Sequence, residues 1–376
     1  MHSERLVLTS PSPGTRRELL VHRFGTAGSG PKVYIQAGLH ADEWPGLLVV
    51  QHLLPKLIAA EAAGKIQGEI VVVPYANPIG MGQNVFGYVA GRFDLTGTGN
   101  FNRNVGDLYG ETRRQLEGRL GTDTEANNRI VMQALKNTVA GLPAETEAAA
   151  LKKVLLGLSI DADYVFDLHC DDRTSAHIYC VDNQQDAARE LSQRLGFRYL
   201  FTEDLEGIVA FDGTHLQTWH WLQREFPEAG LQMPKLAVTI EYRGQYDVED
   251  ALASVDAENL FQYMVDQGII DQEPVGQETV EVLVTSLQAV DTMYAEATGL
   301  LVFSATMEDK LSKGEQFAEI VVLDGEPNQR IPIRARTDGY LMGLSHRRLV
   351  RPGDQVAKVC GSEPLAHRKA GNLLQL

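Results

Sequence analysis

The residues that most directly suggest chemistry are His40 and Glu43, in the run HADE that follows the apolar stretch 32–38. Side chains spaced i and i+3 in a helical turn point the same way. A ring nitrogen and a carboxylate oxygen are both good zinc donors, so the pair predicts part of a metal site. The motif is short and unspecific, and the alternative is a helix-capping pair with a solvated Glu43.

A second pair, Asp167 and His169, ends the apolar run DADYVFDLH (161–169). In α/β folds, ligands bind at the carboxyl ends of strands. His169 is therefore a candidate third protein ligand, and a His₂Glu site with one open position is of the catalytic type. Residues two apart on a strand share a face, so Asp167 is placed to orient a ligand histidine. The alternative for His169 is a hydrogen-bonded core histidine.

Glu241 follows Val238-Thr239-Ile240 at the end of another apolar run, 235–244. A carboxylate is costly to bury unless it has a partner or a function. Beside a zinc-activated water, Glu241 would act as general base and then protonate the leaving amine. The alternative is an ordinary strand-end glutamate paired with Arg243.

Asn102 and Arg103 lie in the Gly- and Asn-rich stretch 83–110. A guanidinium is a rigid fork that suits a carboxylate or a developing oxyanion. Arg92, upstream in the same stretch, is a weaker candidate for that role. The alternative is a loop arginine in a surface ion pair. Long irregular loops within compact domains are usually functional or mobile.

The surrounding elements have to bring these side chains together. Apolar runs alternate with helical patterns up to about residue 270, which predicts an α/β domain with a largely parallel sheet and flanking helices. We expect strands at 32–38, 69–75, 161–169, 177–181 and 235–244, and helices after Gly46 and at 123–157, 184–195 and 248–268. The helical stretch 123–157 is expected to break near Gly141–Pro143.

The pattern changes near residue 270. A polar stretch with a proline is typical of a linker, and it is followed by short β-like runs that are separated by turns. We therefore predict two domains, a catalytic α/β domain over 1–270 and a small all-β accessory domain, a barrel or sandwich, over 279–376.

The charge, the cysteine count and the lengths of the apolar runs limit the partners and the compartment that we expect. The chain carries 34 Lys+Arg against 50 Asp+Glu, a net charge of −16, which disfavours nucleic acid and anionic lipid as partners. Three cysteines cannot form a disulfide framework. No apolar leader or 18-residue apolar run is present, so we expect a cytoplasmic protein without membrane contact.

Taken in order, these motifs resemble the zinc carboxypeptidase-like superfamily, and more closely its succinylglutamate desuccinylase/aspartoacylase branch. The matching phrases are AGLHADEWPG, VVVPYANPIG, FNRN, VFDLHCDD and TIEYRG, spread over roughly residues 30–270. The resemblance implies a zinc-carboxypeptidase-like mixed sheet. It implies one Zn²⁺ held by His40, Glu43 and His169, with Glu241 as general base. It also implies that Asn102 and Arg103 take hold of the substrate carboxylate.

The chain departs from the family pattern in its other arginines. The family has an arginine shortly before the NR pair that polarises the scissile carbonyl, and Arg92 is its counterpart here across a longer loop. Aspartoacylase-type enzymes also use an arginine before the catalytic glutamate, but residues 226–234 contain none. Arg243 is a candidate substitute, and the acyl group recognised is left open.

The C-terminal segments resemble the halves of a barrel-sandwich hybrid, as in biotinyl and lipoyl modules. No Met-Lys pair stands at a turn, so we expect an unmodified accessory domain that covers the site or mediates assembly, which leaves homo-oligomerisation open.

The sequence therefore predicts a zinc-dependent hydrolase that cleaves the linear amide of a small N-acylated amino acid or related amine. Two alternatives remain. One is a zinc carboxypeptidase that acts on peptides, and the other is a catalytically inactive binding homologue.

Overall fold

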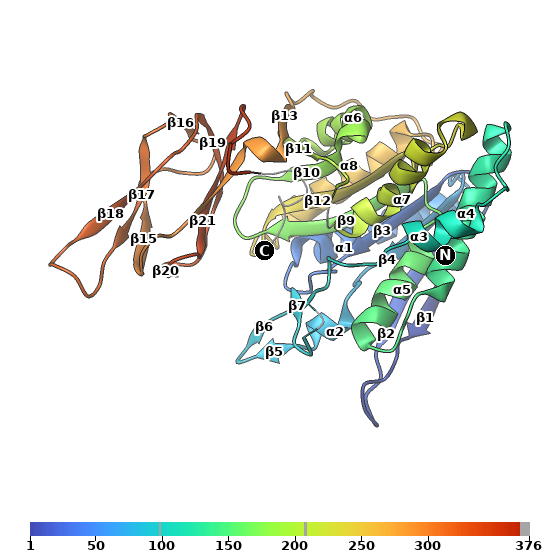
Figure 1. The fold of residues 1–376 in the computed structure, drawn as a ribbon, viewed down its shortest axis with the longest axis horizontal. Helices are drawn as coiled ribbons and strands as arrows, with labels where there is room; N and C mark the ends of the chain where they lie inside the picture. Colours follow the sequence, from blue (N-terminus) through green and yellow to red (C-terminus); the bar gives the residue numbers. More distant parts are fainter. Residues whose placement is uncertain (98, 207–208, 369–376) are drawn as a thin grey trace.

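The computed structural model describes residues 1–97, 99–206 and 209–368. Within this part of the chain, a nine-stranded sheet forms the centre, in the order β1-β2-β4-β3-β9-β12-β10-β11-β13 (Figure 1). Its strands are β1 (His2–Val7), β2 (Glu18–Gly25), β3 (Lys32–Ala37), β4 (Glu69–Val73), β9 (Tyr164–Asp171), β10 (His177–Val181), β11 (Tyr199–Glu203), β12 (Leu236–Gly244) and β13 (Leu283–Ser286).

The sheet is mixed but largely parallel, as the sequence predicted. Strands β4, β3, β9 and β12 run parallel to one another. Strand β10 then pairs antiparallel with β12, and β11 and β13 run parallel to β10. At the opposite edge, β1 and β2 add an antiparallel hairpin. The carboxyl ends of β3, β9 and β12, where the candidate site residues follow, therefore meet at one edge.

Helices cover both faces of this sheet. They are α1 (Pro45–Ala62), α2 (Pro78–Met81), α3 (Tyr109–Gln115), α4 (Thr124–Gly141), α5 (Glu147–Ser159), α6 (Gln185–Leu195), α7 (Phe211–Glu225) and α8 (Asp250–Asp266). None of the helices in the described ranges is long and apolar enough to cross a lipid bilayer.

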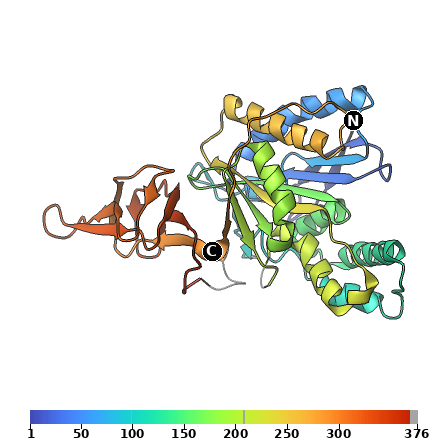
Figure 2. The ribbon, with the colours of Figure 1, turned by 90° about the horizontal axis from the view of Figure 1, so that it is seen from above.

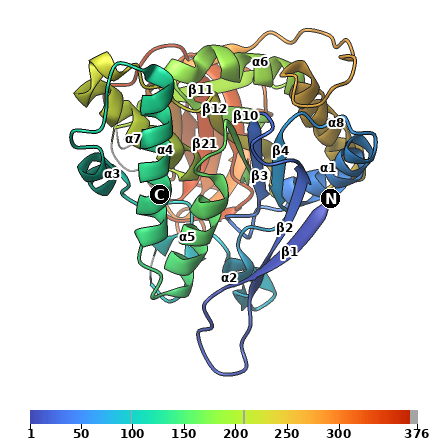
Figure 3. The same ribbon diagram turned by 90° about the vertical axis from the view of Figure 1, so that its right-hand side faces the viewer.

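Side chains along the central strands point alternately to the two faces of the sheet, so the core forms two layers. On β3, Tyr34 packs with the α4, α5 and α7 side chains, whereas Val33 and Ile35 pack with those of α1, α6 and α8. Successive strand residues point to opposite faces, so strands buried on both sides read as continuous apolar runs. Figure 3 shows the two helical layers on either side of the sheet.

The stretch 83–110 is more ordered than expected. It contains two short antiparallel pairs, β5 (Asn84–Val85) with β6 (Tyr88–Val89) and β7 (Phe93–Asp94) with β8 (Gly99–Asn100). The first turn has positive φ at Phe86 (51°) and Gly87 (88°), the backbone that a two-residue hairpin requires. These pairs lack the alternating apolar pattern by which longer strands are recognised.

The C-terminal region is all-β, as predicted. Two four-stranded sheets, β14-β21-β19-β16 and β18-β17-β15-β20, enclose their own apolar core, and they project to one side of the large sheet (Figure 2). The strands are β14 (Val290–Tyr294), β15 (Gly299–Phe303), β16 (Lys310–Leu311), β17 (Gln316–Val321), β18 (Arg330–Arg334), β19 (Gly339–Leu344), β20 (Leu349–Val350) and β21 (Gln355–Gly361).

The division expected at residues 270–279 remains a prediction, with one difference in its detail. Strand β13, which the sequence placed in the accessory region, pairs with β11 of the large sheet. The two regions are also joined by backbone hydrogen bonds, from Ser175 N to Met342 O (3.0 Å) and from Leu344 N to Arg173 O (2.9 Å). The small sheets therefore dock beside the end of β9.

Candidate metal centre and cavity

Three elements position the predicted ligands. Strand β3 ends at Ala37, and His40 and Glu43 follow it in the turn before α1, which begins at Pro45. His169 lies near the end of β9, the strand that pairs in parallel with β3. Proline suits the first position of a helix because its missing N–H has no partner there. The strand–turn–helix connection thus holds His40 and Glu43 over the end of the neighbouring strand.

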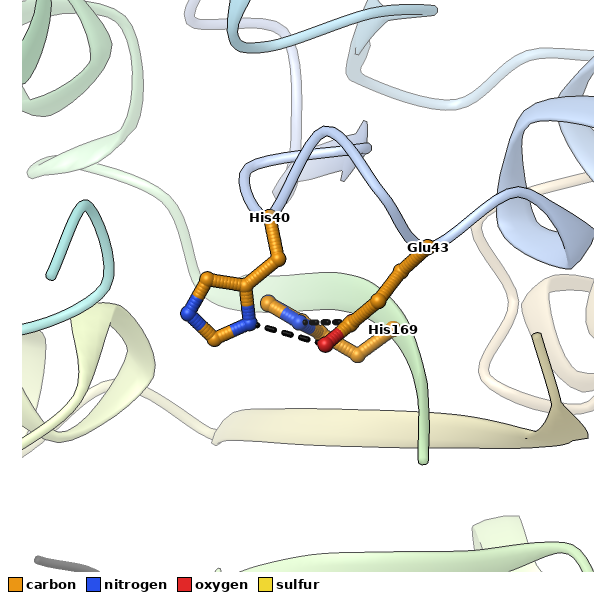
Figure 4. A group of neighbouring side chains, drawn as sticks. All are labelled: His40, Glu43 and His169. Carbon is orange, nitrogen blue, oxygen red and sulfur yellow. Dashed lines mark hydrogen bonds and ion pairs between the residues drawn. The ribbon is translucent and has the colours of Figure 1, made fainter. Parts of the chain in front are cut away.

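His40, Glu43 and His169 form one cluster, as the sequence predicted (Figure 4). Glu43 lies between the two rings, with Oε1 2.9 Å from Nδ1 of His40 and Oε2 2.6 Å from Nδ1 of His169. Each of the three residues is at most 3% exposed. Their candidate ligand atoms all lie within 4.8 Å of one another, so the cluster could hold a metal ion.

The outward ring nitrogens have partners of their own. Nε2 of His40 lies 2.8 Å from Asn100 Oδ1, and Nε2 of His169 lies 3.0 Å from Asp167 Oδ2. Asp167 also accepts a hydrogen bond from Gln36 (2.9 Å). Ligand histidines commonly donate their second nitrogen to such an acceptor, which fixes the tautomer. The contact of His40 with Asn100 has hydrogen-bond geometry, whereas Asp167 Oδ2 lies close to His169 without one. Two imidazoles and a carboxylate held like this fit zinc.

The charges of the cluster suit a cation as well. Burial raises the pKa of Glu43, but His40 and His169 more than offset it and hold that pKa well below its ordinary value. Burial, together with the neighbouring Arg92, lowers the pKa of His40 to about 4. Glu43 is therefore ionised and His40 neutral, as metal ligands must be. Burial lowers the pKa of His169, but Asp167 and then Glu43 outweigh it and hold that pKa well above its ordinary value, so a metal ion would have to displace a proton from that ring.

Glu241 lines the same cavity as the cluster. It lies opposite His169 in the register between β12 and β9, and its Oε2 has no hydrogen-bond partner among the described residues. Burial first, and then the charges of Glu43 and Asp171, raise its pKa to about 8. A carboxylate with a raised pKa near a metal cluster has the properties of a proton-transfer group.

Arg92, Asn102 and Arg103 also reach the cavity. Arg92 Nη1 donates to Glu43 Oε1 (2.8 Å). Asn102 Nδ2 lies 3.4 Å from His169 Nε2, and its Oδ1 accepts a hydrogen bond from Phe211 N (2.7 Å). Arg103 Nη1 donates to Asn102 O (2.7 Å). The loop before α3 thus brings three polar side chains beside the cluster.

Arg243 is the predicted site residue that the structure does not bring to the others. It forms an ion pair with Asp256 on α8 and is absent from the described residues that line the cavity. Glu241 and Arg243 would share a face on a regular strand, but Arg243 has φ of 63° and the register shifts between Glu241 and Gly244. This bulge turns the arginine away, and the alternative pairing of Glu241 with Arg243 is not formed either.

Several residues in or beside the cavity escaped the sequence analysis. Asn100, the partner of His40, lies two residues before the NR pair. Glu203 ends β11, a strand that was not predicted. Lys358 comes from β21 and reaches Asp171 across the docked C-terminal sheets. Only the polar run Asp171-Asp172 after His169 hinted at further charged partners.

Residues 29–265 match the family model of the succinylglutamate desuccinylase/aspartoacylase catalytic domain. The chain belongs to this family. Its name denotes deacylating hydrolases, which agrees with the enzyme class that the sequence predicted. The N-alpha-acetyl-L-2,4-diaminobutyric acid deacetylase of Halomonas elongata is 22% identical over 345 residues, covering 88% of this chain and 82% of that protein.

Solved structures of the family share the fold. A succinylglutamate desuccinylase/aspartoacylase family protein from Shewanella amazonensis aligns with a TM-score of 0.83 at 22% identity, over 96% of this chain and 98% of that one. The ectoine utilization protein EutE (DoeB) from Ruegeria pomeroyi, in its product-bound structure, aligns with a TM-score of 0.64 at 16% identity, over 96% and 95% of the two chains. The fold, over almost the whole chain, is therefore shared with solved structures of distant sequence.

Proposed function

We propose that the protein is a zinc-dependent deacylase that hydrolyses the linear amide of a small N-acylated amino acid or related amine. The observation that carries the proposal is the position of Glu43, buried between the Nδ1 atoms of His40 and His169, in a cavity that Glu241 also lines. The name of the Halomonas elongata relative, a deacetylase of an N-acetylated amino acid, supports a small substrate over a peptide.

His40, Glu43 and His169 would hold the zinc ion. Bound zinc supplies Lewis acidity, which polarises the amide carbonyl and makes water a stronger acid. Glu241 takes the proton from the attacking water and returns it to the leaving nitrogen. Its raised pKa of about 8 suits both steps, because a group that exchanges a proton near neutral pH works best as acid and base in turn.

The polar residues of the loop before α3 would stabilise the developing charge and bind the substrate. Arg92, beside Glu43, is placed to stabilise negative charge that develops on the carbonyl oxygen. Arg103 and Asn102 bind the substrate carboxylate, for which the guanidinium fork is suited. Together they would orient the amide so that its nitrogen faces Glu241.

The test is amine release from N-acetyl and N-succinyl amino acids by zinc-loaded protein, run beside peptides and beside a chelator-treated sample to which zinc is returned. Chelator-sensitive release that zinc restores supports the proposal. Release of only C-terminal residues from peptides would instead indicate a carboxypeptidase. Protein with a full complement of zinc that hydrolyses none of the amides would contradict the proposal and favour a binding homologue.

A further inference from the structure

A buried lysine on α5 lies against the loop segment 100–103, which carries Asn102 and Arg103. The Lys152 side chain is only 9% exposed, and it is absent from the described residues that line the cavity of the metal cluster. Its Nζ donates to Arg103 O (2.8 Å) and lies 3.4 Å from Asn100 O. Helix α5 packs in the core layer that it forms with α4 and α7. The ammonium therefore joins a well-packed helix to both ends of the loop segment.

Burial of this charge has a cost that the two carbonyls partly offset. Burial lowers the pKa of Lys152, whereas the charge of Asp94 favours the ammonium form. Within the described ranges no carboxylate forms an ion pair with Lys152, and its hydrogen bonds go to backbone carbonyls. An ammonium is expensive to bury unless polar partners surround it. A role for the charge should therefore be sought in the segment that it holds.

The segment that Lys152 holds connects the metal cluster to the proposed carboxylate site. Asn100 Oδ1 lies 2.8 Å from His40 Nε2 and accepts a hydrogen bond from Asn102 N (2.8 Å). Arg103 Nη1 donates to Asn102 O (2.7 Å). Movement of the Asn100 and Arg103 carbonyls would therefore displace the side chains that are proposed to bind the substrate.

The next residue along α5 makes the same kind of contact elsewhere. Lys153 is partly buried, and its Nζ donates to Leu142 O (2.7 Å), in the connection between α4 and α5. Leu142 and Lys153 are absent from the described residues that line the cavity. Two adjacent lysines thus hold two stretches of backbone through carbonyls, and the stretch held by Lys152 leads to the cavity. Lys153 is a matched reference for the structural contribution of such a contact.

We propose that Lys152 is a positioning residue, which fixes the backbone of the segment 100–103 so that the Arg103 guanidinium and the Asn102 amide meet the substrate carboxylate. Lys152 itself touches neither the substrate nor the candidate metal ligands. The inference rests on the proposed function, in which Arg103 and Asn102 bind that carboxylate. A displacement of about 1 Å in a group that holds the substrate can lower catalysis by about a hundredfold, so a residue outside the cavity can set the selectivity for carboxylates.

The experiment measures carboxylate preference. This is kcat/KM for the most rapidly hydrolysed N-acyl amino acid, divided by kcat/KM for the same compound with its carboxylate converted to a carboxamide. The zinc-loaded variants are Lys152→Met, Lys153→Met, Arg103→Ala and the double variant that combines Lys152→Met with Arg103→Ala. Methionine has nearly the shape of lysine but lacks the ammonium. The ratio cancels effects that act on both substrates alike, such as partial unfolding or loss of zinc.

Lys152→Met should lower the carboxylate preference by about tenfold to a hundredfold. The loss should appear mainly as a higher KM for the acid, because its carboxylate is bound in both the ground state and the transition state. Lys153→Met should leave the preference unchanged. In the Arg103→Ala background, Lys152→Met should have little further effect, since residues that act through one another are not additive. An unchanged preference in Lys152→Met, equal losses in the two lysine variants, or a full further loss in the double variant would overturn the inference.

Lys152→Gln covers the case in which Lys152→Met does not fold. Glutamine keeps a neutral hydrogen-bond donor but is one bond shorter, so it cannot hold both carbonyls, and the carboxylate preference should again fall by about tenfold. An unchanged preference in folded Lys152→Gln would also contradict the inference.

Calorimetry separates this inference from the proposed function. It is run on zinc-loaded protein in the Glu241→Gln background, where hydrolysis should not interfere, with N-acetylalanine and N-acetylalaninamide as the probes. Tighter binding of the carboxylate that weakens with Lys152→Met but not with Lys153→Met supports the inference even if no amide is hydrolysed. Equal binding of the two probes, or a preference that Lys152→Met leaves intact, contradicts it even if the protein is a deacylase.

Discussion

Lys358 on β21 forms an ion pair with Asp171, the last residue of β9 and the second residue after the candidate ligand His169. The two side chains are 14% and 18% exposed. Burial raises the pKa of Asp171, but Lys358 and then His177 more than offset this and lower it. One ion pair therefore connects the C-terminal sheets to the strand that carries a predicted metal ligand.

Replacing Lys358 by methionine should destabilise the protein by about 1–3 kcal/mol, because Asp171 loses a charged partner in a mostly buried site. Urea denaturation measures the change. Lys310→Met is the matched control, since Lys310 is exposed on β16 of the same region. Equal stability of the two variants would show that the ion pair contributes nothing to docking.

Replacing Glu241 by glutamine should leave zinc binding intact and lower kcat by about 10²–10⁴-fold, the usual contribution of a general acid–base group. Zinc content and amine release, measured on the same preparation, check both parts. Glu281→Gln, an exposed position before β13, should retain full activity. Turnover by Glu241→Gln at the wild-type rate would exclude Glu241 as the base.

Replacing either His40 or His169 by alanine should remove zinc, because in the proposed site each would supply one of three protein ligands. Elemental analysis after gel filtration measures the metal content. His215→Ala is the control: His215 is equally buried, but its ring nitrogens contact Phe211 O and Ser159 Oγ. That variant should lose stability and keep its zinc. Full zinc content in both ligand variants would place the metal elsewhere.

Glu203 should make stability depend on pH. Its pKa rises from 4.5 to about 8 on folding, so between these values the folded protein holds a proton that the unfolded chain has released. Stability then falls as pH rises through this window. Glu203→Gln lacks this proton, so its stability relative to the wild type should increase from the acidic to the alkaline end. Urea denaturation across the window checks the trend, and a constant difference would contradict it.

The grouping of the three candidate ligands could be predicted because its determinants are local. His40, Glu43 and His169 each follow or end an apolar strand, and parallel strands bring such ends to one edge. The failure at Arg243 is also local, since a bulge reverses the side-chain alternation on which the prediction relied. Its positive φ could not be anticipated for an arginine.

The rest of the cavity depends on tertiary contacts. Nothing in the run before Glu203 distinguished β11 from a loop, and the antiparallel pairing of β10 with β12 is not encoded in either strand alone. Lys358 meets Asp171 only because the C-terminal sheets dock beside β9. Residues separated this far in the chain leave no periodic signal, so the sequence indicated the candidate ligands but not the residues that line the rest of the cavity.

The contribution of β21 to the cavity also sets the order in which the site is completed during synthesis. All three candidate ligands and Glu241 leave the ribosome well before Lys358 does, so a nascent chain can bring these side chains together while one wall of the cavity is still missing. Substrate enclosure then becomes the final step of maturation, and hydrolytic activity reports that the whole chain has folded.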